Sequence, residues 1–390
     1  MKWKFYSLAF VAGMSILTAC SSDDNNDNDG NGGNGNGNEI ENGTILKGTI
    51  TSDVTLAAGN TYKLSGEYIV EEGATLHIEE GVKIIAVYDD IADYILVKQG
   101  GKINAVGTPD KPIVMTSEKE EPGAWGGIHI CGRAHTNAEG GKGSSEIGGA
   151  VYGGNDDADN SGTLQYIRLE YTGFAFDEEH EANGISFYGV GNGTIVDYCQ
   201  AYKGSDDGFE FFGGSVNVSN LVAVSCSDDS FDWTEGWNGK GTNLVAYQEA
   251  ESTLGYDCDC LMECDNNGSN NAATPVAHPV LKNLILVGNG GSKQGIRLRA
   301  GTEVEIDNAK VCGKGQPLTV ETALTENALK NGTSKLTNIT LTAELSSKEG
   351  IYTHADFIAV TSNKVNANLS YSSFEDIKKE CSWMNGSWVK

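Results

Sequence analysis

The feature that most constrains the fold is a short repeat between residues 183 and 247. Three copies follow one another, and each opens with a run in which apolar and polar residues alternate. The starts of the copies are 24 and 22 residues apart, which indicates a structural repeat. The openings read Gly184-Ile185-Ser186-Phe187, Gly208-Phe209-Glu210-Phe211 and Ser230-Phe231-Asp232-Trp233. A unit this short cannot bury its apolar face alone, so neighbouring copies must stack on one another and share a core.

The repeat predicts an all-β fold, a right-handed parallel β-helix (a solenoid) with long loop insertions. Short strands separated by Gly and Asn corners fit one coil of such a solenoid, and the handedness of parallel crossovers gives the right hand. A β-sandwich has strands at similar spacing but lacks this self-similarity. We expect the second strands of the three copies at 194–196, 220–222 and 243–245.

Two segments interrupt the repeat. Residues 132–162 are rich in Gly, Asn, Asp and Ser, and a second interruption runs from 248 to about 279. Loops of this length are more often functional or mobile than inert. Helical periodicity is confined to 322–331 and 374–380. We expect the tail at 381–390 to cap the last coil against edge pairing.

The N-terminus has the features of an export signal. Residues 1–19 combine a basic start with a short apolar run and are predicted to be a lipoprotein signal peptide. Leu17-Thr18-Ala19-Cys20 resembles a bacterial lipobox, which implies lipidation of Cys20. Residues 20–39 are almost entirely Ser, Asp, Asn and Gly, so we expect a flexible tether. The β-helix domain is then predicted at 40–390.

The charge restricts the classes of partner. The chain has a formal net charge of −27, which argues against nucleic acids and against anionic membrane surfaces. Membrane contact is therefore expected only through the lipid at Cys20. An acidic chain is suited to binding cations, or is simply soluble. We expect a monomer.

The polar residues of the repeated strand form a candidate ligand-binding row. Alternation places Ile185 and Phe187, and their equivalents, in the core, so the residues between them point outward. Equivalent residues of adjacent coils lie roughly 4.8 Å apart, and carboxylates at that spacing repel one another unless a cation or ligand group lies among them. If Leu261–Cys264 forms the coil that follows, Glu263 joins the row. The candidate residues are Glu210, Asp232, Glu263, Arg297 and Arg299.

Two acidic triplets predict a metal site. Ser205-Asp206-Asp207 and Ser227-Asp228-Asp229 precede two of the repeated strands and are 22 residues apart, so they should stack at one corner. Oxygen ligands gathered in this way suit Ca²⁺. The alternative is that Asp side chains close the corner as Asx-turns without a metal. The candidate Ca²⁺ ligands are Asp206, Asp207, Asp228 and Asp229.

The same row offers an enzymatic alternative. Glu210 and Asp232 can serve as acid and base on a glycosidic bond, while Arg297 can hold a uronate or act as the base of a lyase. The strings at 204–208 and 295–298 resemble polygalacturonase motifs, but the Gly-His-Gly of that family is absent. Whether the chain is an enzyme therefore stays open.

Nine cysteines remain to be placed. Without Cys20 they number eight, and disulfides are the usual state of cysteines in exported proteins. We expect at least one bridge within 258–264, although a metal site or buried unpaired thiols are alternatives.

Several longer strings resemble a known family. They are Pro122–Gly127, Tyr152–Asp157, Asp159–Leu164, Asp207–Gly214 and Glu263–Gly268. In this order they are similar to secreted right-handed parallel β-helix lipoproteins of the Bacteroidota, whose activity is unassigned, over about 44–302. Ser22-Asp23-Asp24 likewise resembles the export signal of surface lipoproteins in that phylum. The resemblance implies a β-helix, an outer-membrane lipoprotein exposed at the surface, and no particular substrate.

These observations favour a cell-surface lipoprotein that binds glycan or another extracellular ligand through the row and the two loops. Several aromatic residues near corners suit carbohydrate recognition, or else they only pack there: Phe174, Phe176, Tyr188, Phe212 and Trp237. The alternative function is a polysaccharide lyase or glycoside hydrolase acting on acidic polysaccharide.

Overall fold

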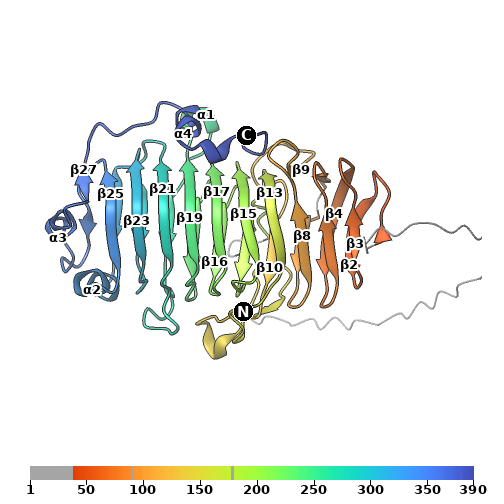
Figure 1. Ribbon diagram of the computed structural model, residues 1–390, viewed down its shortest axis with the longest axis horizontal. Coiled ribbons are helices and arrows are strands. Elements are labelled where there is room, and N and C mark those ends of the chain that lie inside the picture. The colour runs from red at the N-terminus through yellow and green to blue at the C-terminus, as the bar shows by residue number, and fades with distance from the viewer. Residues whose placement is uncertain (1–37, 90, 177–179) are drawn as a thin grey trace, which may run out of the picture. The chain divides into compact units, whose positions relative to one another are not determined.

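The computed structural model describes residues 38–89, 91–176 and 180–390, which form a right-handed parallel β-helix (Figure 1). Each strand pairs in parallel with its equivalent in the next coil, and only the short β11 and β12 pair antiparallel. This arrangement confirms the fold class predicted from the repeat. The signal peptide, Cys20 and nearly all of the tether lie outside the described residues. Within the described part, no helix is long and apolar enough to cross a membrane.

One ladder of short strands carries the row of polar residues. Its register pairs Ser186 with Glu210, Glu210 with Asp232, and Asp232 with Glu263, as the repeat predicts. This short-strand ladder begins with the second part of β4 (Thr61–Val70) and continues with β7 (Tyr94–Val97), β10 (Ile128–Cys131), β14 (Ile185–Tyr188), β16 (Phe209–Phe212), β18 (Phe231–Thr234), β20 (Met262–Cys264), β22 (Gln294–Leu298), β24 (Gln316–Val320) and β26 (Ser346–Ser347).

The other sides of the coils are formed by longer strands. From β13 onward one bent strand covers both sides, whereas in the first coils these sides are separate strands, and β13 pairs with both β8 and β9. The long-strand ladder consists of β13 (Gly162–Glu170), β15 (Ile195–Tyr202), β17 (Asn217–Val224), β19 (Lys240–Tyr247), β21 (Val280–Val287), β23 (Glu305–Cys312), β25 (Lys335–Leu341) and β27 (Lys364–Val365). The first coils add β1 (Asn38–Glu39), β2 (Ile45–Ile50), β3 (Val54–Leu56), β5 (Thr75–Ile78), β6 (Lys83–Ala86), β8 (Lys102–Val106) and β9 (Ile113–Ser117).

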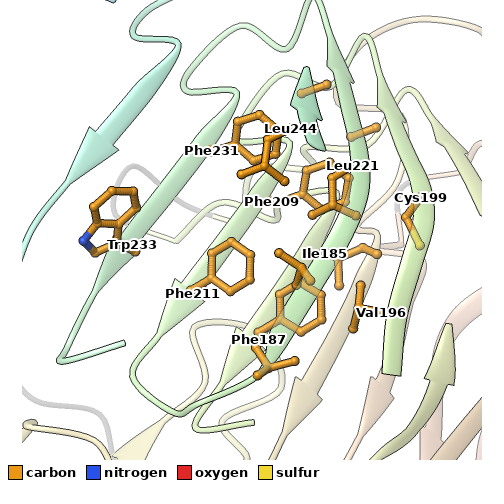
Figure 2. Packing of buried hydrophobic residues seen from close by; sticks show 14 of the residues in the cluster. Ile185, Phe187, Val196, Cys199, Phe209, Phe211, Leu221, Phe231, Trp233 and Leu244 are labelled. Atoms are coloured by element: carbon orange, nitrogen blue, oxygen red, sulfur yellow. The ribbon is translucent and has the colours of Figure 1, made fainter. Parts of the chain in front are cut away.

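The core is a stack of equivalent side chains, one from each coil (Figure 2). Phe187 lies over Phe211 with ring centroids 5.0 Å apart, and Phe209 lies over Phe231 at 5.6 Å. All four rings are buried. Burial of one such side chain contributes about 1.5–3 kcal/mol, so each copy of the repeat stabilises its neighbours.

The bend of each long strand is made by a residue with positive φ. Tyr166 and Tyr198 occupy this position in β13 and β15, and asparagines occupy it in the next coils. The asparagine side chains form a hydrogen-bonded ladder, in which Asn243 donates to Asn220 (2.8 Å) and Asn283 donates to Asn243 (3.0 Å). Asparagine tolerates the left-handed region better than most residues, and its amide continues the ladder.

We expect Asn243→Ala to lower the free energy of unfolding by about 2–3 kcal/mol, measured by equilibrium urea unfolding. Alanine strains the left-handed backbone at φ 61° and loses two hydrogen bonds. The matched control is Asn243→Gly, which adopts this φ freely and should cost less because only the hydrogen bonds are lost. Equal losses in the two variants would show that the backbone conformation contributes nothing.

Two expectations about the strands and the tail were wrong. Asn220–Val222 aligns with Tyr198–Gln200 rather than with 194–196, because Tyr198 replaces Asn at the bend and hides the equivalence. The tail does not cap the last coil. It runs back across the long-strand ladder (Figure 1), where it belongs to one apolar cluster with β17, β19 and β21, and Trp388 packs against Tyr166 and Tyr198 of β13 and β15.

The two insertions and the helices lie outside the coils. The first insertion (132–162) contains η1 (Glu139–Gly141) and the hairpin of β11 (Gly143–Ser144) and β12 (Val151–Tyr152). The second (248–279) is two loops, because β20 lies within it as a regular coil. The predicted helices are confirmed as α2 (Ala323–Asn331) and α4 (Phe374–Glu380), and the chain adds α1 (Glu251–Leu254), α3 (His354–Ala359) and η2 (Ser382–Met384).

The predicted disulfide within 258–264 does not form. All eight cysteines of the described chain are free and buried. Cys264 lies in register with Trp233 and Leu298, both of which face the core, whereas Cys260 lies at the corner before the strand. The thiols of this segment therefore fill space, which is the alternative that the sequence left open.

Candidate functional site

The row of polar residues crosses the outer face of the short-strand ladder. Cross-strand pairing continues from Glu263 to Arg297 and then to Thr319. Glu210, Asp232, Glu263 and Arg297 are half-buried, so they are accessible but not freely solvated. The structure thus brings together, in one row, the candidate residues that alternation predicted to be neighbours.

The corner aspartates join this row instead of forming a separate site. Asp207 Oδ1 accepts a hydrogen bond from the backbone N–H of Asp229 (2.8 Å), and Asp229 Oδ1 accepts one from the N–H of Cys260 (2.6 Å). One oxygen of each side chain therefore links its corner to the backbone of the next coil, which differs from the local Asx-turn that the sequence offered as an alternative. Asp206 and Asp228, which occupy the preceding position in each coil, are half-buried and exposed respectively.

The carboxylates converge into overlapping groups. One oxygen each of Asp207, Glu210 and Asp232 lie within 4.8 Å of one another, and the same holds for Asp229, Asp232 and Glu263. A third group contains Asp206, Asp207 and Asp228. We call these seven residues the carboxylate cluster: Asp206, Asp207, Glu210, Asp228, Asp229, Asp232 and Glu263.

The centre of the cluster has few hydrogen-bond donors within the described chain, although the charge of Arg299 acts to lower the pKa of Asp232. Asp232 Oδ1 is buried and has no hydrogen-bond partner among the described residues. Asn183 donates its Nδ2–H to Glu210 (2.6 Å) and also to Ser186 (3.0 Å). A buried carboxylate oxygen without a donor is costly, so this oxygen is the atom that a bound cation would stabilise most.

Burial and mutual repulsion raise the carboxyl pKa values. Burial, followed by the charge of Asp228, raises the pKa of Asp206 to about 8. Burial and the charge of Asp259 raise the pKa of Asp228 to about 6. The pKa values of Asp207, Glu210, Asp229 and Asp232 are likewise raised well above their usual range, first by burial and then by one another.

The arginines at the other end of the row are paired. Arg297 contacts Glu263 (2.7 Å) and Glu321 (3.3 Å), while Arg299 contacts Asp265 (2.7 Å) and also Glu263. Burial alone lowers the pKa of Arg297, but Glu321 and Glu263 outweigh it and raise the pKa. A guanidinium held in this way stays charged, which argues against Arg297 as the base of a lyase.

Two neighbours of the cluster were not anticipated. Asn183 occupies the position of Asp207 one coil earlier, so aligning the repeats would have identified it. Glu146 comes from the first insertion, accepts a hydrogen bond from the Tyr188 hydroxyl (3.1 Å) and interacts electrostatically with Glu210. The repeat gave no signal for Glu146, because the insertion has no counterpart in other coils.

Three of the five aromatic residues are not available for recognition. Tyr188, Phe212 and Trp237 are buried, with Tyr188 stacked on Phe212 at 4.4 Å and Trp237 stacked on Phe211 at 4.1 Å. For these three the structure shows packing, which is the alternative that the sequence left open. Phe174 is half-buried and Phe176 is exposed, and their rings lie edge to face at 5.2 Å.

Comparison with known proteins agrees with the observed fold. A family model described as "Pectate-lyase like beta helix domain" matches residues 48–390, which is most of the chain. No curated protein and no solved structure matches the chain. The name of the family is consistent with a carbohydrate-related function in general and specifies no ligand. The chain belongs to the pectate-lyase-like β-helix domain family.

Proposed function

We propose that this protein binds an extracellular glycan through a cation held by the carboxylate cluster. One observation carries the proposal: Asp232 belongs to two groups of three carboxylates whose oxygens lie within 4.8 Å of one another, and its buried Oδ1 has no donor among the described residues. Hard oxygen ligands from several coils suit Ca²⁺, which accepts six to eight oxygens. A cation bound here can use its remaining coordination positions for glycan hydroxyl or carboxylate oxygens.

The location expected from the N-terminal sequence supports glycan binding. A lipid on Cys20 and a polar tether would hold the β-helix outside the outer membrane, where extracellular glycans are accessible. Both features rest on the sequence alone. The net charge of −27 supports a bridging cation, because an acidic glycan would otherwise be repelled.

We expect Ca²⁺ to bind the purified protein in calorimetry and Asp232→Asn to weaken that binding about tenfold or more, equivalent to roughly 1.4 kcal/mol. Asparagine keeps the shape of the side chain and removes the charge at the centre of the cluster. The control is Glu251→Gln, which changes an exposed carboxylate in α1. No heat of Ca²⁺ binding and no rise in melting temperature would contradict the proposed site.

The enzymatic alternative keeps one specific observation in its favour. One oxygen each of Glu210 and Asp232 lie within 4.8 Å of one another, so two carboxyl groups are close together, as in retaining glycosidases. Incubation with acidic polysaccharides tests it, because release of reducing ends that disappears in Glu210→Gln would establish hydrolysis at this site.

A further inference from the structure

The row of outward residues changes abruptly from covered to accessible. In register, it runs from Leu96 through His129 and Ser186 to Glu210. Leu96, His129 and Ser186 are completely buried, whereas Glu210 and the next three members are half-buried. At the far end the side chain of Arg297 is 28% exposed. The accessible part of the row therefore runs from Glu210 to Arg297. The next member, Thr319, is completely buried, and Ser346 after it is half-buried again.

The first insertion covers the buried part. Its residues Ile147, Ala150 and Tyr152 pack in one apolar cluster with Leu96 and Tyr188 of the short-strand ladder. Tyr152 is nearly completely buried. The insertion thus covers the outer face of β7, β10 and β14, where an extended ligand would otherwise continue.

Polar contacts fix the insertion in this position. The hydroxyls of Tyr152 and Thr136 both donate to Glu235 Oε2 at 2.7 Å. Asn137 donates to Asn266 Oδ1 (2.8 Å) and so joins the first insertion to the second. Because apolar packing and hydrogen bonds both hold the first insertion in place, we do not expect it to open readily.

Glu146 is the acidic residue of the first insertion that lies next to the row. Its carboxylate accepts a hydrogen bond from Tyr188 and interacts with Glu210, the first accessible member. The end of a glycan chain differs chemically from its interior, because the terminal sugar carries a free hydroxyl where an interior sugar is linked. A carboxylate at the closed end of the row is placed to accept a hydrogen bond from that hydroxyl.

We propose that the site recognises the end of a glycan chain, with the terminal sugar against Glu146 and the rest of the chain directed toward Arg297. This inference rests on the proposed function of the carboxylate cluster. The recognition elements repeat once per coil, so a chain lying along them follows the solenoid axis. Such a chain meets the insertion at Ser186 and has to end there.

The test counts binding sites on one polymer cut to different lengths. The probe is polygalacturonate, partially hydrolysed to short, medium and long fractions and titrated at equal mass into the Ca²⁺-saturated protein by calorimetry. For chain-end recognition, the number of protein molecules bound per gram rises in proportion to the number of chain ends. Capping the reducing ends by borohydride reduction then shows which end is bound.

Each outcome separates the two proposals. Stoichiometry that follows mass and not chain ends overturns the chain-end inference and leaves glycan binding intact. The absence of binding in every fraction overturns the proposed function for this polymer class, and the inference falls with it. Glu146→Gln should weaken binding of the short fraction at least tenfold and change Ca²⁺ affinity much less, whereas Glu139→Gln, exposed in the same insertion, should change neither.

Discussion

Raising the pH of the cation-free protein from about 5 to about 8 is expected to lower its melting temperature, and Ca²⁺ is expected to remove most of this effect. The reason is the carboxylate cluster. Its members have pKa values in the folded protein above those of the unfolded chain, which are near 4. Folding therefore takes up protons, and the associated stability is fully present below pH 4.

The pH window follows from the individual groups. Stability is lost as each folded pKa is passed, at about 6 for Asp228, about 7 for Glu146 and about 8 for Asp206. Burial is the main cause of all three shifts, followed by neighbouring charges for the two aspartates. A shift of one pKa unit corresponds to about 1.4 kcal/mol. Asp228 is exposed, so solvent screening reduces its contribution, and most of the loss should come from Asp206, Glu146 and the buried members of the cluster.

Differential scanning calorimetry in EDTA and in Ca²⁺ measures the effect. A bound divalent cation replaces the protons as the balancing charge and stabilises only the folded state. Asp206→Asn should flatten the pH dependence in EDTA, whereas Asp376→Asn, a surface carboxylate of α4, should leave it unchanged. A melting temperature that is constant across this range in EDTA would show that the cluster is not destabilised by its own charge.

The sequence predicted the strand residues of the row better than the residues that surround them. Pairing of Glu210 with Asp232 follows from the repeat alone, because period-2 alternation and a constant coil length determine which side chains become neighbours. Glu263 was predicted only on the condition that a strand interrupts the second insertion, and β20 meets that condition.

What the sequence could not predict depends on contacts between distant segments. Glu146 reaches the cluster because Ile147 and Tyr152 pack on the ladder, and no local pattern encodes the direction of that insertion. The pairing of Arg297 with Glu321 was also missed, because Glu321 follows its strand and does not belong to the alternating run. The path of the tail was missed for the same reason, because the tail packs on the side of the long-strand ladder against residues far away in the sequence.

Trp388→Ala is expected to lower the free energy of unfolding by about 3–5 kcal/mol, the range for deletion of a large buried aromatic side chain. Trp388 is completely buried in the tail and packs edge-on against Tyr166 and Tyr198, with ring centroids 6.1 and 5.6 Å away. These two tyrosines occupy the bends of β13 and β15, so the indole covers the part of the long-strand ladder where asparagine is replaced. Equilibrium urea unfolding measures the change.

Trp388→Phe is the matched control, because it separates packing from hydrogen bonding. The indole Nε1 is buried and has no partner among the described residues, so phenylalanine removes an unsatisfied donor while it keeps most of the apolar contact. We therefore expect Phe to cost far less than Ala. The tail is also held by Lys390, which contacts Glu170 at 3.1 Å, and by the Arg168 guanidinium, which donates to the Ser387 carbonyl at 2.6 Å. If Trp388→Ala cost less than about 1 kcal/mol, these polar contacts would be what holds the tail, and the apolar face beneath it would not depend on the indole for its stability.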